Sequence, residues 1–444
     1  MEKVPDSMTV AGLRQAYRAG TLTPRRVLDE VMARVQRHQS KNIFISAPEE
    51  AKLAAYLNIL EQLDFDTHPL WGIPFVVKDN IDVEGFPTTA ACPDYAYRPG
   101  KNATVVQRLV DAGAIPVGKA NLDQFATGLV GMRSPYGAVH NAWRDELISG
   151  GSSSGSAVSV ALGICAFSLG TDTAGSGRVP AALNGLFGFK PSCGAWPIKG
   201  VVPACVSLDC VTVFAHTMED CLAVDDIARG IQEDDPWSKD LPRKKAGVPK
   251  TVYIPDKQPA FFGPFAREYE AAWEKALETI SHAGFTLEKT DVFLYEEAAA
   301  ILYEGPWVAE RWADLGGFVE THSGKIFSVT EQILRNGERP KASELFQAIH
   351  RLQKMKRMVR QALADAILLM PTAGGTWTRQ EVDADPVQTN TKMGQYTNHC
   401  NLLDLCACSY PVAMAAENLP FGITAFARSG EEDLLASFAK QLFS

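Results

Sequence analysis

The sequence predicts an α/β fold built around one mixed or parallel sheet. From residue 71 onward, short apolar runs alternate with stretches of helical periodicity. A later apolar run at residues 367–371 has the character of a strand that returns to the same sheet. Strands that alternate with helices are typical of folds in which helices connect and cover the strands of one sheet.

Residues 1–70 predict an N-terminal helical segment packed on the core. Thr9 can cap a first helix that ends near Gly20. Thr23, followed by Pro24, provides the cap and the first-turn residue of a second helix. Apolar residues recur at helical spacing in that second helix, at Val27, Leu28, Val31 and Val35.

Residues 71–231 are predicted to form the core of the fold. We expect buried strands at residues 73–77 and 114–117, with a helix over residues 104–110 between them. The stretch 157–169 is almost wholly apolar and rich in small residues, and we interpret it as one helix buried inside the core.

The second half of the chain begins with a charged, proline-rich connection at residues 232–250. Residues 232–366 are predicted to be a helical insertion or second half, with helices over 267–280, 295–315 and 343–366. The last helix carries a basic stripe, Arg351, Lys354, Lys356, Arg357 and Arg360, which favours a solvated face over an RNA contact. Residues 367–444 then return to the sheet.

Composition excludes several classes of protein. With 46% hydrophobic and 21% charged residues, the 444-residue chain is not predominantly disordered. The formal net charge of −9 argues against a nucleic-acid-binding face covering the molecule. The nine cysteines contain no C-x-x-C pair. The N-terminus lacks the apolar segment of a secretory signal and no apolar run is long enough to span a bilayer, so we expect a reduced, cytoplasmic protein.

Three segments carry the chemistry: residues 77–80, which place Lys78 at a strand end, the Gly/Ser loop 149–156, and residues 170–180. A lysine buried in an apolar site has a lowered pKa and can act as a base. Serine needs such a base to become a nucleophile, and a glycine-rich turn leaves backbone N–H groups free to bind an oxyanion. The combination predicts an acyl-transfer site.

Other interpretations of the Gly/Ser loop 150–156 are weaker. A flexible linker is disfavoured because a deeply apolar stretch follows at once. The G-x-x-x-x-G-K-[ST] pattern of a phosphate-binding loop is absent. A G-x-S-x-G nucleophile elbow centred on Ser153 would need an apolar strand before it, whereas residues 142–148 are polar. Lys78 taken alone would be an ordinary surface lysine.

Four blocks in order resemble the amidase signature family of Ser-Ser-Lys hydrolases: residues 72–80, 150–156, 170–180 and 188–191. The resemblance implies a mixed, mainly parallel central sheet covered by helices on both faces. It also implies that Ser176 is the nucleophile, that Ser152 bridges it to Lys78 and is preceded by a cis peptide, and that no metal or cofactor is required. The oxyanion hole would comprise the backbone N–H groups of Thr173, Ala174, Gly175 and Ser176.

Within the family, the chain most resembles the allophanate hydrolases, on the blocks 122–131, 134–138, 202–210, 302–311 and 396–405. That resemblance implies that Tyr303 and Arg311 grip the substrate and that Gly128 lines the same pocket. An arginine can bind a planar carboxylate through two parallel N–H bonds. Eight residues apart, Tyr303 and Arg311 would share one face of a helix. Helix packing for Tyr303 and a salt bridge for Arg311 are the structural alternatives.

The activity implied is deamination of allophanate through an acyl-enzyme, in urea and cyanurate nitrogen catabolism. The resemblance further implies a homodimer that acts on a small molecule and contacts neither nucleic acid nor membrane. The C-terminal decarboxylating domain of full-length relatives is expected to be absent, so that the dicarboxylated product decays unassisted. The alternatives are the catalytic subunit of a glutamine-dependent tRNA amidotransferase, a broad-specificity amidase for aryl or fatty amides, and a non-catalytic scaffold.

Overall fold

A mixed sheet of eleven strands runs through the computed structural model, which describes residues 3–303 and 305–444. The order of the strands across the sheet is β1-β3-β2-β4-β6-β5-β10-β11-β9-β7-β8. Their bounds are β1 Phe44–Ser46, β2 Pro74–Lys78, β3 Ile115–Ala120, β4 Phe167–Asp172, β5 Phe187–Lys190, β6 Cys210–Ala215, β7 Thr251–Pro255, β8 Leu287–Thr290, β9 Ala366–Pro371, β10 Leu405–Ala416 and β11 Leu419–Arg428.

The sheet is mixed as predicted, but it is not mainly parallel. Parallel pairing joins β2 to β3 and β4, and β7 to β8 and β9. The other six neighbouring pairs of this sheet are antiparallel. The prediction was wrong because it inferred crossovers from the alternation of strands with helices. The longest pair, β10 and β11, is instead a hairpin closed by Glu417 and Asn418, and Asn418 has a φ of 54° that such a tight turn favours.

Helices cover both faces of the sheet, as the family resemblance implied. Neighbouring residues of a strand point to opposite faces. In β5, the space beside Gly188 is filled by Ala181 of α6, whereas the Phe187 ring packs against Phe443, which directly follows α16. The α-helices are α1 Val10–Arg18, α2 Pro24–Arg37, α3 Glu50–Leu60, α4 Thr104–Asp111, α5 Ser154–Ala161, α6 Val179–Asn184, α7 Met218–Ala228, α8 Ala266–His282, α9 Phe293–Tyr303, α10 Val308–Thr321, α11 Ser328–Asn336, α12 Ala342–Ala362, α13 Arg379–Ala384, α14 Gln388–Met393, α15 His399–Leu402 and α16 Glu432–Leu442.

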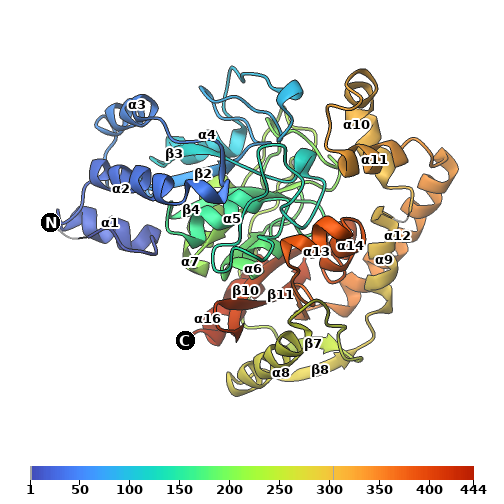
Figure 1. Ribbon diagram of the computed structural model, residues 1–444. Coiled ribbons are helices and arrows are strands. Elements are labelled where there is room, and N and C mark those ends of the chain that lie inside the picture. The colour runs from blue at the N-terminus through green and yellow to red at the C-terminus, as the bar shows by residue number, and fades with distance from the viewer. Residues whose placement is uncertain (1–2, 304) are drawn as a thin grey trace.

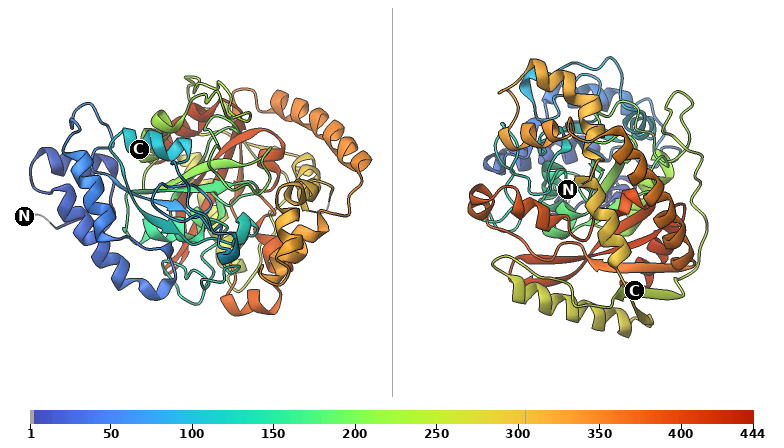
Figure 2. Two further views of the ribbon diagram at one scale, coloured as in Figure 1. Left: turned by 90° about the horizontal axis from the view of Figure 1, so that it is seen from above. Right: turned by 90° about the vertical axis from the view of Figure 1, so that its right-hand side faces the viewer.

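The two ends of the sheet carry different groups of helices (Figures 1 and 2). Helices α1 to α3 gather at one end, and α9 to α12 gather at the other. The predicted caps of α1 and α2 are confirmed, because the hydroxyls of Thr9 and Thr23 accept hydrogen bonds from the backbone of Gly12 and Arg26. Strands β2, β3 and β9 and helices α4, α8 and α12 also form close to where the sequence predicts them.

The apolar stretch 157–169 is not one helix. Helix α5 ends at Ala161, and β4 begins at Phe167 and pairs with β2 and β6. Gly163 separates them with a φ of +64°, and a Cβ on it would lie 1.8 Å from the carbonyl oxygen of Asp6. A buried helix and a buried strand are both continuously apolar, so periodicity could not distinguish them here.

Burial follows the sheet. All nine cysteines are buried. In the part of the chain that the structure describes, no helix combines the length and hydropathy needed to cross a membrane.

Candidate active site

Lys78 and Thr171 meet because their strands are parallel neighbours. The carboxyl ends of adjacent parallel strands lie at the same edge of a sheet, and Lys78 is the last residue of β2 while Thr171 lies near the end of β4. The Lys78 ammonium nitrogen lies 2.7 Å from Thr171 Oγ1 and 2.8 Å from Ser152 Oγ. The predicted contact between Lys78 and Ser152 is therefore present.

Burial lowers the pKa of Lys78 from its ordinary value to about 7. The side chain is completely buried, and among the described residues no carboxylate lies within 4.0 Å of its nitrogen. Asp123, Asp209 and Asp172 act on it from farther away and offset only part of the loss of hydration. A substantial share of Lys78 is thus neutral near pH 7 and able to accept a proton.

Ser152 sits in a turn just before α5, and the Gly151–Ser152 peptide is cis, as the family resemblance implied. The turn is fixed by backbone hydrogen bonds, from Asp123 N to the Ser152 carbonyl (3.0 Å) and from Gly151 N to the Leu129 carbonyl (2.9 Å). A Cβ at Gly151 would lie 2.1 Å from Asp123 Oδ2, so only glycine fits there.

Ser176 lies in the loop between β4 and α6, which is curled around the Asp172 carboxylate. Asp172 accepts hydrogen bonds from Gly175 N (2.8 Å) and Gly177 N (3.0 Å), the residues on either side of Ser176. The Arg178 guanidinium forms a two-bond pair with the same carboxylate, at 2.9 Å for each bond. Burial raises the pKa of Asp172, but the charge and hydrogen bonds of Arg178 outweigh it and hold the pKa below its usual value.

The predicted oxyanion hole needs one correction. The Gly175 N–H donates to Asp172 and is not available to a substrate. In the described chain, the backbone N–H groups of Thr173, Ala174 and Ser176 donate to no protein acceptor. Ala174 does not have a positive φ, so the alanine at this position is unstrained. Gly175 is required for another reason: its φ is +128°, and a Cβ would lie 2.2 Å from Thr397 Oγ1.

Residues distant in sequence brace this loop. Thr397 Oγ1 donates to the Ala174 carbonyl (2.8 Å), and Asn401 Nδ2 donates to the Asp172 carbonyl (2.7 Å). On the other side, Thr173 Oγ1 donates to Asp209 Oδ1 at 2.5 Å. Burial raises the pKa of Asp209 to about 6. The loop is thus held in place before any substrate arrives.

Arg311 is buried in α10 and 1% exposed. Its guanidinium donates to Thr127 Oγ1 at 2.8 Å, on the segment that leads to Leu129 and so to the Gly151–Ser152 turn. Its charge also lowers the pKa of Asp209, which is bonded to the Ser176 loop. Arg311 therefore lies against two of the segments that build the site.

The single helix predicted over residues 295–315 is wrong. Tyr303 is the last residue of α9 and Arg311 lies in α10, with Gly305 and Pro306 between the two helices. Proline favours the start of a helix over its interior, which explains the break. The Tyr303 side chain lies outside what the structure describes.

Gly128 lies beside the buried carboxyl of Asp123 rather than in open space. A Cβ at Gly128 would lie 2.6 Å from Asp123 Oδ2. Asp123 in turn accepts from the backbone N–H groups of Gly131 (3.0 Å) and Arg133 (2.8 Å). The glycine is thus needed to let this segment pack against Asp123.

Several supporting residues were not singled out from the sequence: Thr171, Asp172, Arg178, Asp209, Thr127 and Asp123. Asp172 and Arg178 stand six residues apart in the glycine-rich block, and this adjacent acid and base were the one available signal. Among the residues that the structure describes, no cluster of three or more His, Cys, Asp or Glu side chains could hold a metal ion.

Comparison with known proteins agrees with this geometry. The family model for amidases matches residues 26–436. The chain belongs to the amidase family. This amidase is 40% identical over 412 residues to the urea amidolyase of Saccharomyces cerevisiae, an alignment that covers 90% of this chain. It spans only 22% of that relative's length.

Two further relatives are covered over more of their own length. The allophanate hydrolase structure from Kluyveromyces lactis superposes with a TM-score of 0.92 at 37% identity, over 98% of this amidase and 72% of that chain. In Deinococcus deserti, one component of the glutamyl-tRNA(Gln) amidotransferase is 31% identical over 470 residues, covering 98% of this chain and 96% of the relative.

Proposed function

We propose that this amidase hydrolyses allophanate, releasing ammonia. The observation that carries the proposal is the similarity to an allophanate hydrolase at 37% identity across 98% of the chain, together with a fully buried arginine beside the site. Allophanate is a urea that bears a carboxylate. Arg311 is the cation suited to hold that planar anion.

In the proposed reaction, Ser176 Oγ attacks the terminal amide carbonyl of allophanate. Ser152 takes up the Ser176 proton while passing its own to neutral Lys78. The N–H groups of Thr173, Ala174 and Ser176 bind the oxyanion. As the tetrahedral intermediate collapses, the C–N bond breaks and the proton returns through Ser152 to the leaving ammonia. Water then hydrolyses the acyl-enzyme by the same relay and yields N-carboxycarbamate.

A rigid loop is suited to this chemistry because its donors need no reorganisation during the reaction. The Asp172–Arg178 pair neutralises its own charge internally, which leaves the pKa of Lys78 to be governed by burial. Tyr303 stays a predicted substrate contact on the family resemblance. Gly128 is better explained by its packing against Asp123.

The decisive test is ammonia release from freshly prepared allophanate by wild type, Ser176→Ala and Arg311→Gln. We expect Ser176→Ala to reduce kcat by about 10³-fold or more, because the nucleophile is lost. Arg311→Gln should raise KM by about tenfold or more, because a charge-assisted contact is removed. Full activity of Ser176→Ala would contradict the assignment of the nucleophile.

The glutaminase alternative is tested in the same assay. The catalytic component of a tRNA amidotransferase would release ammonia from glutamine and ignore allophanate. A broad amidase would hydrolyse neutral amides, and Arg311→Gln would leave that activity unchanged. Either result would retain the amidase chemistry and overturn the substrate.

The homodimer, the cytoplasmic location and the boundaries at residues 70, 231 and 366 remain predictions. Multi-angle light scattering of the purified chain tests the first of them. A mass near 97 kDa, twice the 48.3 kDa of one chain, is expected for a homodimer.

A further inference from the structure

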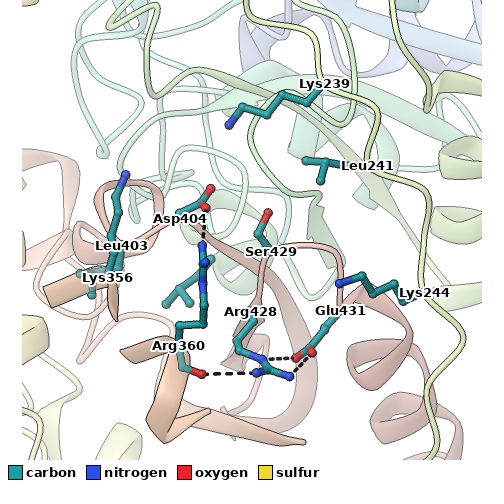
Figure 3. A pocket seen from close by; sticks show the side chains of 11 residues that line it. Lys239, Leu241, Lys244, Lys356, Arg360, Leu403, Asp404, Arg428, Ser429 and Glu431 are labelled. Carbon is teal, nitrogen blue, oxygen red and sulfur yellow. Dashed lines mark hydrogen bonds and ion pairs between the residues drawn. The ribbon is translucent and has the colours of Figure 1, made fainter. Parts of the chain in front are cut away.

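A basic pocket lies on a part of the surface that the proposed reaction does not use. Its volume is about 360 Å³, within the range of small-molecule sites. The connection after α7, the end of α12, the turn before β10 and the end of β11 form its walls. Figure 3 shows Lys239, Lys244 and Lys356 on three sides of the opening, with Ser429 between them.

The charges in this pocket are unbalanced. Five cationic side chains and two carboxylates line it. Both carboxylates are already paired with the two arginines, Asp404 with Arg360 at 3.9 Å and Glu431 with Arg428. Within residues 3–303 and 305–444, the three lysines have no carboxylate within 4.0 Å. The pocket thus holds about three positive charges in excess, in a chain whose net charge is −9.

A second basic hollow of about 350 Å³ adjoins the first and shares Lys244 and Glu431 with it. Lys245 and Lys250 also line this hollow, and Lys250 is paired with Asp365 at 2.8 Å. The positive surface therefore continues past Lys244. This shape suits an anion that carries several charges in a row better than a single small ion.

The chemistry of the lining favours a phosphate chain. Lysine ammonium groups bind phosphate oxygens as point charges, and three of them around one opening match a di- or triphosphate. None of the residues that line the pocket is aromatic, so a nucleobase would find no stacking partner there. The surface is confined to the two hollows, whereas RNA binding calls for a longer basic face.

We propose that this pocket binds the di- or triphosphate group of a small molecule, inorganic or nucleotide. The basic stripe predicted on the helix of residues 343–366 is then only partly a solvated face. Lys356 and Arg360 belong to the pocket. The proposal does not depend on the substrate of the amidase.

Calorimetric titration with sodium tripolyphosphate, ATP and citrate, at about 50 mM salt to limit screening, tests the proposal. The variants are Lys239→Gln/Lys356→Gln and a charge-matched control, Lys101→Gln/Lys275→Gln, whose lysines are exposed and lie outside the pocket. Thermal melting and ammonia release check that each variant is folded.

We expect one saturable site for tripolyphosphate, weakened about tenfold or more by the pocket variant and less than about twofold by the control. Equal binding of ATP would mean that the phosphate chain alone is recognised, and tighter binding of ATP would assign the site to nucleotides. Both outcomes support the proposal. Absence of saturation below about 1 mM, equal binding of citrate, or equal weakening by the control variant would overturn it. So would binding of single-stranded RNA by a chain that does not bind tripolyphosphate.

Discussion

Lys78 is a buried cation whose neighbours are hydroxyls. Thr171 and Ser152 accept its hydrogen bonds, and the nearest strong acid in the sequence, Asp79, is bonded to Thr89 and lies 3.5 Å from Lys119 instead. Asp172 is likewise occupied by Arg178. Because each of these two buried carboxylates has its own partner, Lys78 is left without one, and its proton is weakly held.

This arrangement predicts how activity depends on pH. The pKa of Lys78 is lowered to about 7, so the neutral base that the proposed reaction needs increases as pH rises through that value. We expect kcat/KM to rise about tenfold between pH 6 and 7.5 and then level off. A rising limb centred near pH 10, the range of an ordinary lysine, would contradict the assignment.

At the scale of single elements, α10 is the helix that positions Arg311. Its Glu310 accepts hydrogen bonds from the backbone and the hydroxyl of Ser207, both at 2.8 Å, and from the Trp307 indole at 2.9 Å. The helix is thereby tied to the loop that carries Asp209. The break at Gly305 and Pro306 lets α10 turn into this contact.

Glu310→Ala should therefore affect binding more than chemistry. We expect KM for allophanate to rise about tenfold while kcat falls less than about threefold, because the anchor moves and the Ser176 loop does not. Glu320→Ala, an exposed position on the same helix, is the matched control and should leave both constants unchanged. Equal losses of kcat in the two variants would argue against a positioning role for Glu310.

At the scale of the whole molecule, one charged network joins segments that are far apart in sequence. Arg229, just after α7, pairs with Asp225 at 2.9 Å and with Glu432 of α16 at 3.1 Å. Glu432 also accepts from the backbone and hydroxyl of Ser192, which follows β5. The C-terminal helix is thus bonded to the middle of the chain through buried groups.

Removing the shared cation should destabilise the molecule. Arg229→Met leaves two buried carboxylates without their partner, and we expect the free energy of unfolding to fall by about 3–5 kcal/mol in urea titrations. Arg18→Met removes an exposed pair with Asp66 and should have no measurable effect. Equal stability of the two variants would mean that the buried network does not hold α16 in place.

Local signals predicted a large part of the molecule. Caps and spacing located α1, α2 and α4, and the motif blocks identified Lys78, Ser152 and Ser176, because these features depend on residues close together in the chain. Periodicity failed at residues 157–169, where a buried helix and a buried strand have the same composition. It also failed at residues 295–315, where Gly305 and Pro306 were not weighed as a break.

Residues close together in the chain are enough to identify an α/β amidase with a serine–serine–lysine motif. Which groups are available for chemistry follows only from the folded molecule. Gly175 gives its N–H to Asp172, and Gly128 makes room for Asp123. Thr397 and Asn401 brace a loop more than 200 residues away in the chain. Such contacts depend on strand direction and side-chain packing across the sheet, which leave no mark on local sequence.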